Sequence, residues 1–152
     1  MNRLALDALP DLYELDETAW LDTMAGLARE GRATELDLPH LAEYLADMAK
    51  RERREVESRL VVLLAHVLKW RFQPRRRSRS WRVTIIEHRQ ELELLVGRGI
   101  LQNHAEEALS RSYARAVERA AAETGLAAGR FPAECPYSVE QLLTVDLTSL
   151  GG

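Results

Sequence analysis

The sequence is poor in the residues that interrupt helices or cross-link a chain. Its 152 residues include 8 glycines, 5 prolines and one cysteine, Cys135. Because glycine and proline are scarce, the composition favours long helices over a fold of many turns. A single cysteine cannot form a disulfide within the chain and is typical of a reducing compartment. We therefore expect a cytoplasmic, helical protein.

Long apolar runs are also missing. The longest, from Leu60 to Leu68, includes His66 and is far shorter than the ~20 residues that cross a bilayer. Asp7 interrupts the apolar start of the chain, which therefore lacks the core of a signal peptide. The sequence predicts no association with a membrane.

Apolar residues recur at helical spacing over most of the chain, and this pattern predicts an all-α fold. We expect four main helices in a bundle, over residues 16–30, 37–72, 80–96 and 103–125, and a short C-terminal helix over 138–143. The long second helix is either continuous or broken near Lys50. The first dozen residues are expected to form a loose arm. The length fits a single helical domain over residues 1–152.

Polar side chains mark the predicted helix starts. N-caps are expected at Asp16 and Asp37, and capping boxes at Asn103 with Glu106 and at Ser138 with Gln141. The predicted fourth helix has a face of small side chains, which indicates that a neighbouring helix packs close. The face consists of Ala105, Ala108, Leu109, Ser112, Ala116 and Ala120. A homodimer through this face is one interpretation.

The corner between the second and third helices carries the only unusual charge pattern. Residues 69–82 hold seven basic side chains and no acidic one, in a chain whose net charge is −3. Trp70, Phe72 and Trp81 alternate with these charges. Arginines among aromatic rings can hold phosphates and stack on bases, so the corner is a candidate surface for a nucleic acid or an acidic protein. The candidate residues are Arg75, Arg76, Arg77, Arg79 and Arg82.

A structural role for the same corner is the competing interpretation. Trp70 and Trp81 end and begin two apolar stripes, so they are expected to plug one end of the bundle and leave no face for a base. Some of the arginines would then pair with acidic residues or bind the last carbonyls of the second helix. The arrangement of Arg75, Arg76, Arg77 and Arg79 distinguishes the two interpretations.

Enzymatic signatures are absent. No Glu-x-x-His pair occurs, so a di-metal carboxylate bundle is excluded, and Asp37-x-x-His40 is better explained by a helix cap. His66 and His88 lie on apolar faces, where a hydrogen-bonded core histidine is the usual explanation. Cys135 has no histidine within thirty residues in sequence, and no glycine-rich phosphate loop is present. The sequence predicts no catalytic residue, no metal and no cofactor.

Several segments together resemble a bacterial family known as domain of unknown function 29, common in cyanobacteria and proteobacteria. The matching segments are Trp20, Leu36-Asp37-Leu38 with Leu41, Ser58-Arg59-Leu60, His66-Val67-Leu68-Lys69-Trp70, Gln73-Pro74, Arg77-Ser78-Arg79-Ser80-Trp81 with Thr84-Ile85, and Cys135-Pro136-Tyr137 with Gln141. They cover roughly residues 11–147. The chain departs from the family pattern at Pro39, where an acidic or amide residue is typical. The resemblance implies a compact helical domain and transfers no activity.

These observations favour a non-enzymatic helical interaction module of uncharacterised role. The alternative is a nucleic-acid-binding or regulatory protein that uses the basic corner. A histidine-based metal protein or enzyme is the third hypothesis.

Overall fold

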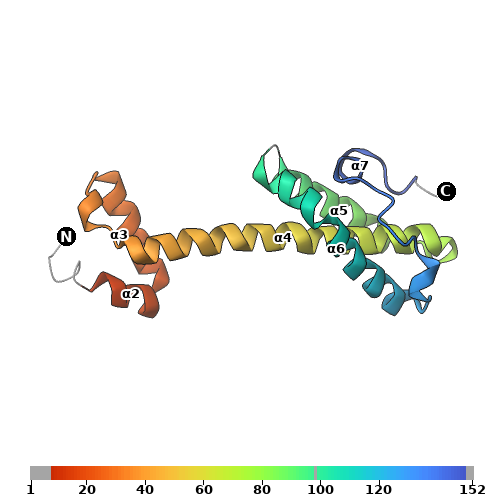
Figure 1. Cartoon of the computed structure of the whole chain (residues 1–152), viewed down its shortest axis with the longest axis horizontal. Coiled ribbons are helices and arrows are strands. Elements are labelled where there is room, and N and C mark those ends of the chain that lie inside the picture. Colours follow the sequence, from red (N-terminus) through yellow and green to blue (C-terminus); the bar gives the residue numbers. More distant parts are fainter. Residues whose placement is uncertain (1–7, 98, 150–152) are drawn as a thin grey trace. The chain divides into compact units, whose positions relative to one another are not determined.

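The computed structural model describes residues 8–97 and 99–149, and within them the chain forms helices and loops but no strand (Figure 1). The α-helices are α2 (Leu9–Leu15), α3 (Glu17–Arg29), α4 (Leu38–Phe72), α5 (Arg79–Val96), α6 (Ile100–Thr124) and α7 (Val139–Thr144). Three short 3-10 helices connect them: η1 (Ala33–Glu35), η2 (Pro74–Arg76) and η3 (Ala128–Arg130). The predicted all-α class, the long second helix and the short C-terminal helix are confirmed. Among the described residues, no helix combines the length and apolar character that crossing a membrane requires.

The chain groups into two compact units, Met1–Lys50 and Arg51–Gly152, and α4 contributes to both. Each unit has its own apolar core. α4 is one helix from Leu38 to Phe72, so the alternative of a break near Lys50 is not realised. A single domain over residues 1–152 stays a prediction.

The N-terminal unit is built around one tryptophan. Trp20 and Leu27 of α3 are fully buried, and Leu9 of α2 and Met24 pack beside them. The predicted cap is confirmed, because the Asp16 carboxylate accepts a 3.1 Å hydrogen bond from the backbone N–H of Ala19. These contacts fix α2 and α3 against the beginning of α4.

The expected loose arm is wrong for residues 9–12, which belong to α2; residues 1–7 lie outside the described residues. Pro10 occupies the first turn of α2, where its missing N–H removes no helical hydrogen bond. Leu9 and Leu12 contact the core of the unit. The tertiary contacts therefore stabilise a helix that is too short to be stable alone.

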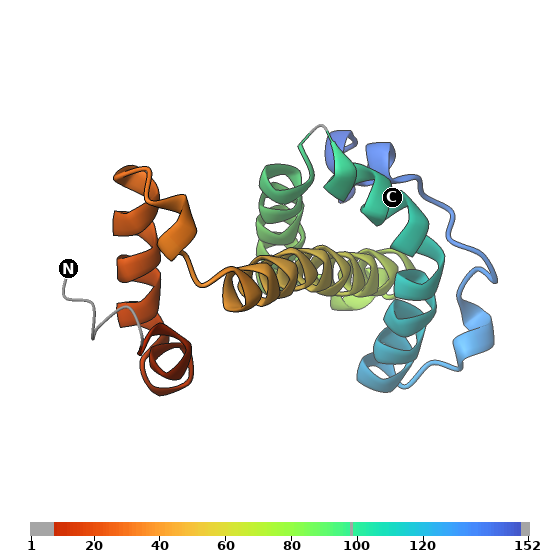
Figure 2. The ribbon, with the colours of Figure 1, turned by 60° about the vertical axis from the view of Figure 1, so that its left-hand side comes forward.

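The C-terminal unit packs α5, α6 and α7 around the second part of α4 (Figure 2). Val56, Leu60, Leu63, Leu64 and Leu68 of α4 are fully buried in its core. The small face of α6 lies against this core, with Ala105, Ala116 and Ala120 fully buried. The predicted close packing is confirmed, but the interpretation of this face as a dimer surface is wrong, because the chain itself covers it.

Glycines set the limits of α5 and α6. Gly97 and Gly99 adopt φ values of 42° and 154°, which lets the chain reverse at once after α5. α6 therefore begins at Ile100 with Gly99 as its N-cap, and the predicted capping box at Asn103 and Glu106 is wrong. Gly125 ends α6 in the left-handed conformation, as predicted.

The segment after α6 turns back alongside that helix and ends in α7 (Figure 2). The Tyr113 hydroxyl of α6 donates a 2.5 Å hydrogen bond to the Pro132 carbonyl and so fixes the extended segment. The predicted capping box of α7 is confirmed, with reciprocal hydrogen bonds between Ser138 and Gln141.

Candidate interaction surface

Part of the basic corner serves the fold. Lys69 is 7% exposed and forms a 2.7 Å ion pair with Glu123 of α6. Nε of Arg77 donates a 2.8 Å hydrogen bond to the Trp70 carbonyl near the end of α4. A guanidinium nitrogen of Arg71 lies 3.4 Å from the Tyr137 hydroxyl. Three of the seven charges are thus engaged within the chain.

The aromatic rings of the corner are also engaged. The guanidinium of Arg77 lies 5.0 Å from the Trp70 ring centroid, and Nε1 of Trp70 donates a hydrogen bond to the Thr148 carbonyl. Phe72 packs edge-to-face on Phe131. Lys69 Nζ lies 4.8 Å from the Trp81 ring centroid. Both tryptophans are half-buried, and contacts within the chain occupy all three rings.

The remaining candidates of the corner are exposed. Arg75, Arg76, Arg79 and Arg82 lie on the surface, whereas Arg77 is half-buried against Trp70. Hydrogen bonds from Thr148, with a contribution from the charge of Arg82, lower the pKa of Asp146. The five predicted residues therefore differ in their exposure. Their role in binding stays a prediction.

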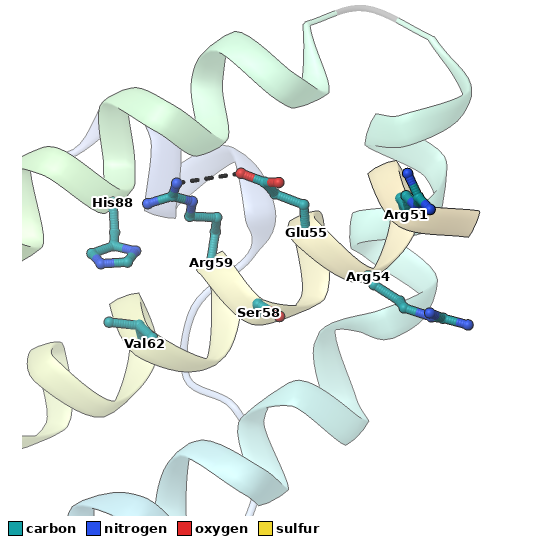
Figure 3. A pocket seen from close by; sticks show the side chains of 7 residues that line it. All are labelled: Arg51, Arg54, Glu55, Ser58, Arg59, Val62 and His88. Atoms are coloured by element: carbon teal, nitrogen blue, oxygen red, sulfur yellow. Dashed lines mark hydrogen bonds and ion pairs between the residues drawn. The ribbon is translucent and has the colours of Figure 1, made fainter. Parts of the chain in front are cut away.

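A second arginine-rich surface lies on α4, on the side away from its core-facing residues. Two adjoining hollows of about 520 and 410 Å³ share Arg54, Ser58 and Val62. Six residues of α4 and His88 of α5 line the first hollow (Figure 3). In the second, α4 is flanked by Arg115 and Arg119 of α6. We call the two hollows together the arginine groove.

The floor of the arginine groove is small and mostly apolar, and its edges are basic. Ser58, Val61 and Val62 form the floor. The arginines at its edges are Arg51, Arg54, Arg59, Arg115 and Arg119, and the acidic lining residues are Glu55 and Glu57.

Ion pairs neutralise only some of these charges. Arg59 pairs with Glu55 at 3.3 Å, and Arg119 pairs with Glu123 at 2.9 Å. Glu57 lies 2.5 Å from Nε of Arg111. Burial tends to raise the pKa of Glu57, but Arg111 and His104 more than offset it, so the pKa is lowered and the group stays ionised.

Three arginines of the groove keep an uncompensated charge. Arg51, Arg54 and Arg115 are exposed and form no ion pair with any other residue that the structure describes. Nδ1 of His88, in the same groove, is buried and makes no hydrogen bond within the described part of the chain. Burial lowers the pKa of His88, so its imidazole is neutral near pH 7. The groove thus offers three cations and one unused polar atom.

The other titratable candidates have structural roles. Nδ1 of His66 lies 2.9 Å from the Val62 carbonyl, and burial lowers the pKa of this imidazole, which agrees with the predicted core histidine. The Cys135 thiol donates to the Tyr137 carbonyl, and burial raises its pKa, which disfavours the thiolate. In the described residues, histidine, cysteine and acidic side chains nowhere gather in threes that could hold a metal ion.

Asp37 does more than begin α4. Its buried Oδ2 accepts a 3.1 Å hydrogen bond from Nε1 of Trp20 and lies 2.8 Å from Nδ1 of His40. The Tyr13 ring stacks on His40, with centroids 4.3 Å apart. The spacing Asp37-x-x-His40 was visible in the sequence and was assigned to a helix cap, whereas the contacts with Trp20 of α3 and Tyr13 of α2 depend on packing.

Sequence reasoning also missed the arginine groove. It requires Arg54 of α4 and Arg115 of α6 to line one hollow, although they are far apart in sequence. The available signal was the helical spacing of Arg51, Arg54, Ser58 and Val62, which places them opposite the buried stripe of α4.

The helices and this surface define an all-α protein with a basic, partly apolar groove. The family model described as "Domain of unknown function DUF29" matches residues 12–148. The chain belongs to this family, as the resemblance predicted. No match was found among curated proteins or among solved structures.

Proposed function

We propose that the chain is a non-enzymatic helical interaction module that binds an acidic protein surface in its arginine groove. The observation that supports this most is the set of uncompensated charges on Arg51, Arg54 and Arg115 around the floor of Ser58, Val61 and Val62. Arginine is enriched among the residues that contribute most of the binding energy in protein interfaces. An apolar floor is suited to an apolar side chain of the partner.

The lining of the groove favours a protein over a nucleic acid. Among the residues that the structure describes, no phenylalanine, tyrosine or tryptophan lines it, and the imidazole of His88 is its one aromatic ring, so it offers little surface on which successive bases could stack. An acidic protein surface needs only a few carboxylates placed opposite the three free guanidinium groups.

A binding titration tests this proposal. The probe is a labelled amphipathic helical peptide of about 20 residues with glutamates beside a leucine stripe, and its control has glutamine for every glutamate. Fluorescence anisotropy should show binding of the acidic peptide that weakens with salt. The double variant Arg54→Glu/Arg115→Glu should lose about tenfold or more in affinity, because each substitution replaces an attraction by a repulsion.

The corner supplies a matched control. Arg75→Glu/Arg79→Glu makes the same change of charge on exposed arginines outside the groove and should bind the peptide like the parent protein. If the corner variant loses binding and the groove variant keeps it, the groove is not the site. If single-stranded RNA or DNA binds more tightly than the peptide across the salt series, the nucleic-acid alternative replaces this proposal.

A further inference from the structure

The two units carry opposite charge. Residues 1–50 have 11 acidic and 4 basic side chains, a net charge of −7, whereas residues 51–152 have 13 acidic and 17 basic side chains, a net charge of +4. Unequal charge of this kind makes one unit of a chain electrostatically complementary to the other unit of a second copy.

The acidic charge of the N-terminal unit is concentrated around Tyr13. The Tyr13 ring stacks on His40 of α4, and Glu43 and Asp47 follow His40 at spacings of three and seven residues, on the same side of that helix. Glu14 follows Tyr13 directly. Burial and then the charges of Glu43, Glu17, Asp47 and Glu14 raise the pKa of Tyr13.

This cluster offers the unpaired carboxylates that would complement the arginines of the groove. Glu14, Glu17, Glu43 and Asp47 form no ion pair with any residue in the described part of the chain. They surround a half-buried tyrosine, as the arginines of the groove surround Ser58, Val61 and Val62. Tyrosine and arginine are the side chains that most often contribute strongly to protein interfaces.

We propose that the arginine groove binds the acidic cluster around Tyr13 of a second copy of this chain. The inference rests on the proposed function and names its partner. Each copy has both surfaces, so the two copies exchange the same contact in a two-fold symmetric dimer. This interface would bring the four carboxylates opposite the three uncompensated arginines.

A charge exchange in the full-length chain tests the inference. One variant reverses the acidic surface, Glu14→Lys/Glu43→Lys, and the other reverses the groove, Arg54→Glu/Arg115→Glu; all four side chains are exposed. Sedimentation equilibrium of the parent should show a mass that rises with concentration towards twice 17.3 kDa at low salt and falls to the monomer mass in high salt. Each variant alone should stay monomeric, because like charges then face each other.

The decisive sample is an equimolar mixture of the two variants. Lysines of the first meet glutamates of the second, and the two unchanged surfaces also match, so the mixture should dimerise although neither component does. A parent protein that is monomeric at all concentrations overturns this inference, while peptide binding in the groove would leave the proposed function standing. A parent dimer that the mixture does not restore also overturns it, because the copies then meet through other surfaces.

Discussion

The ammonium group of Lys69 lies 2.7 Å from Oε2 of Glu123 and so joins the end of α4 to the end of α6. Arg119 binds the other oxygen of the same carboxylate at 2.9 Å. Lys69 is nearly buried, whereas the Glu123 side chain is about one-third exposed. The first positive charge of the basic corner therefore stabilises the fold.

Glu123→Gln should destabilise the protein by about 1–2 kcal/mol at pH 7, because it leaves a buried ammonium without a counter-ion. The hydrogen bond from Lys69 lowers the pKa of Glu123 below its ordinary value. The stability that this pair contributes is therefore present above the unfolded pKa of about 4.3 and is lost as the pH falls through the folded pKa.

Urea denaturation followed by circular dichroism at pH 7 and pH 3 measures this effect. The midpoints of parent and variant should differ at pH 7 and lie closer together at pH 3, which is below the unfolded pKa of about 4.3, because protonation of Glu123 weakens the pair. A difference that is equal at both pH values would show that the charge of Glu123 does not matter.

Asp37→Ala should destabilise the N-terminal unit by about 1–3 kcal/mol, because the fully buried indole N–H of Trp20 loses its acceptor. Urea denaturation of the parent and the variant gives the difference. Asp22→Ala on the exposed side of α3 is the control and should change stability by no more than ~0.5 kcal/mol. Equal effects of the two substitutions would contradict the role of Asp37.

Tyr113 gives a prediction at alkaline pH. Burial raises its pKa to about 12, whereas an unfolded tyrosine ionises near pH 10. The contribution of its protonated form to stability is present below pH 10 and is lost as the pH rises from about 10 to about 12. The parent should therefore lose stability in this range more steeply than Tyr113→Phe.

Tyr113→Phe should also cost about 0.5–1.5 kcal/mol at pH 7, because it removes the hydrogen bond to the Pro132 carbonyl. The difference in absorbance at 295 nm between parent and variant, followed during titration, isolates the ionisation of this hydroxyl. If this absorbance difference develops near pH 10, Tyr113 ionises like an exposed tyrosine, and its buried environment is contradicted.

The sequence predicts the helices well where local chemistry determines them. Asp16 begins α3 and Ser138 begins α7 because each side chain accepts a hydrogen bond from a backbone N–H three residues on. The prediction from local sequence was wrong at α2, because tertiary contacts stabilise that helix. It was also wrong at the start of α6, because Gly97 and Gly99 allow the helix to begin before Asn103.

The surface was harder to predict than the helices. Counting charges along the chain pointed to residues 69–82, but Lys69, Arg71 and Arg77 are engaged with Glu123, Tyr137 and Trp70. The free charges of the arginine groove come from separate helices. Only their packing in three dimensions brings Arg54 and Arg115 to one hollow.

The measurement that tests the arginine groove most directly is a nuclear magnetic resonance titration of the ¹⁵N-labelled protein with the acidic peptide. We expect the largest shifts of backbone amide signals at Arg54, Ser58, Val62 and Arg115. Shifts concentrated on Arg75 to Arg82 would assign binding to the basic corner instead. The absence of any shift at low salt would contradict an acidic protein partner.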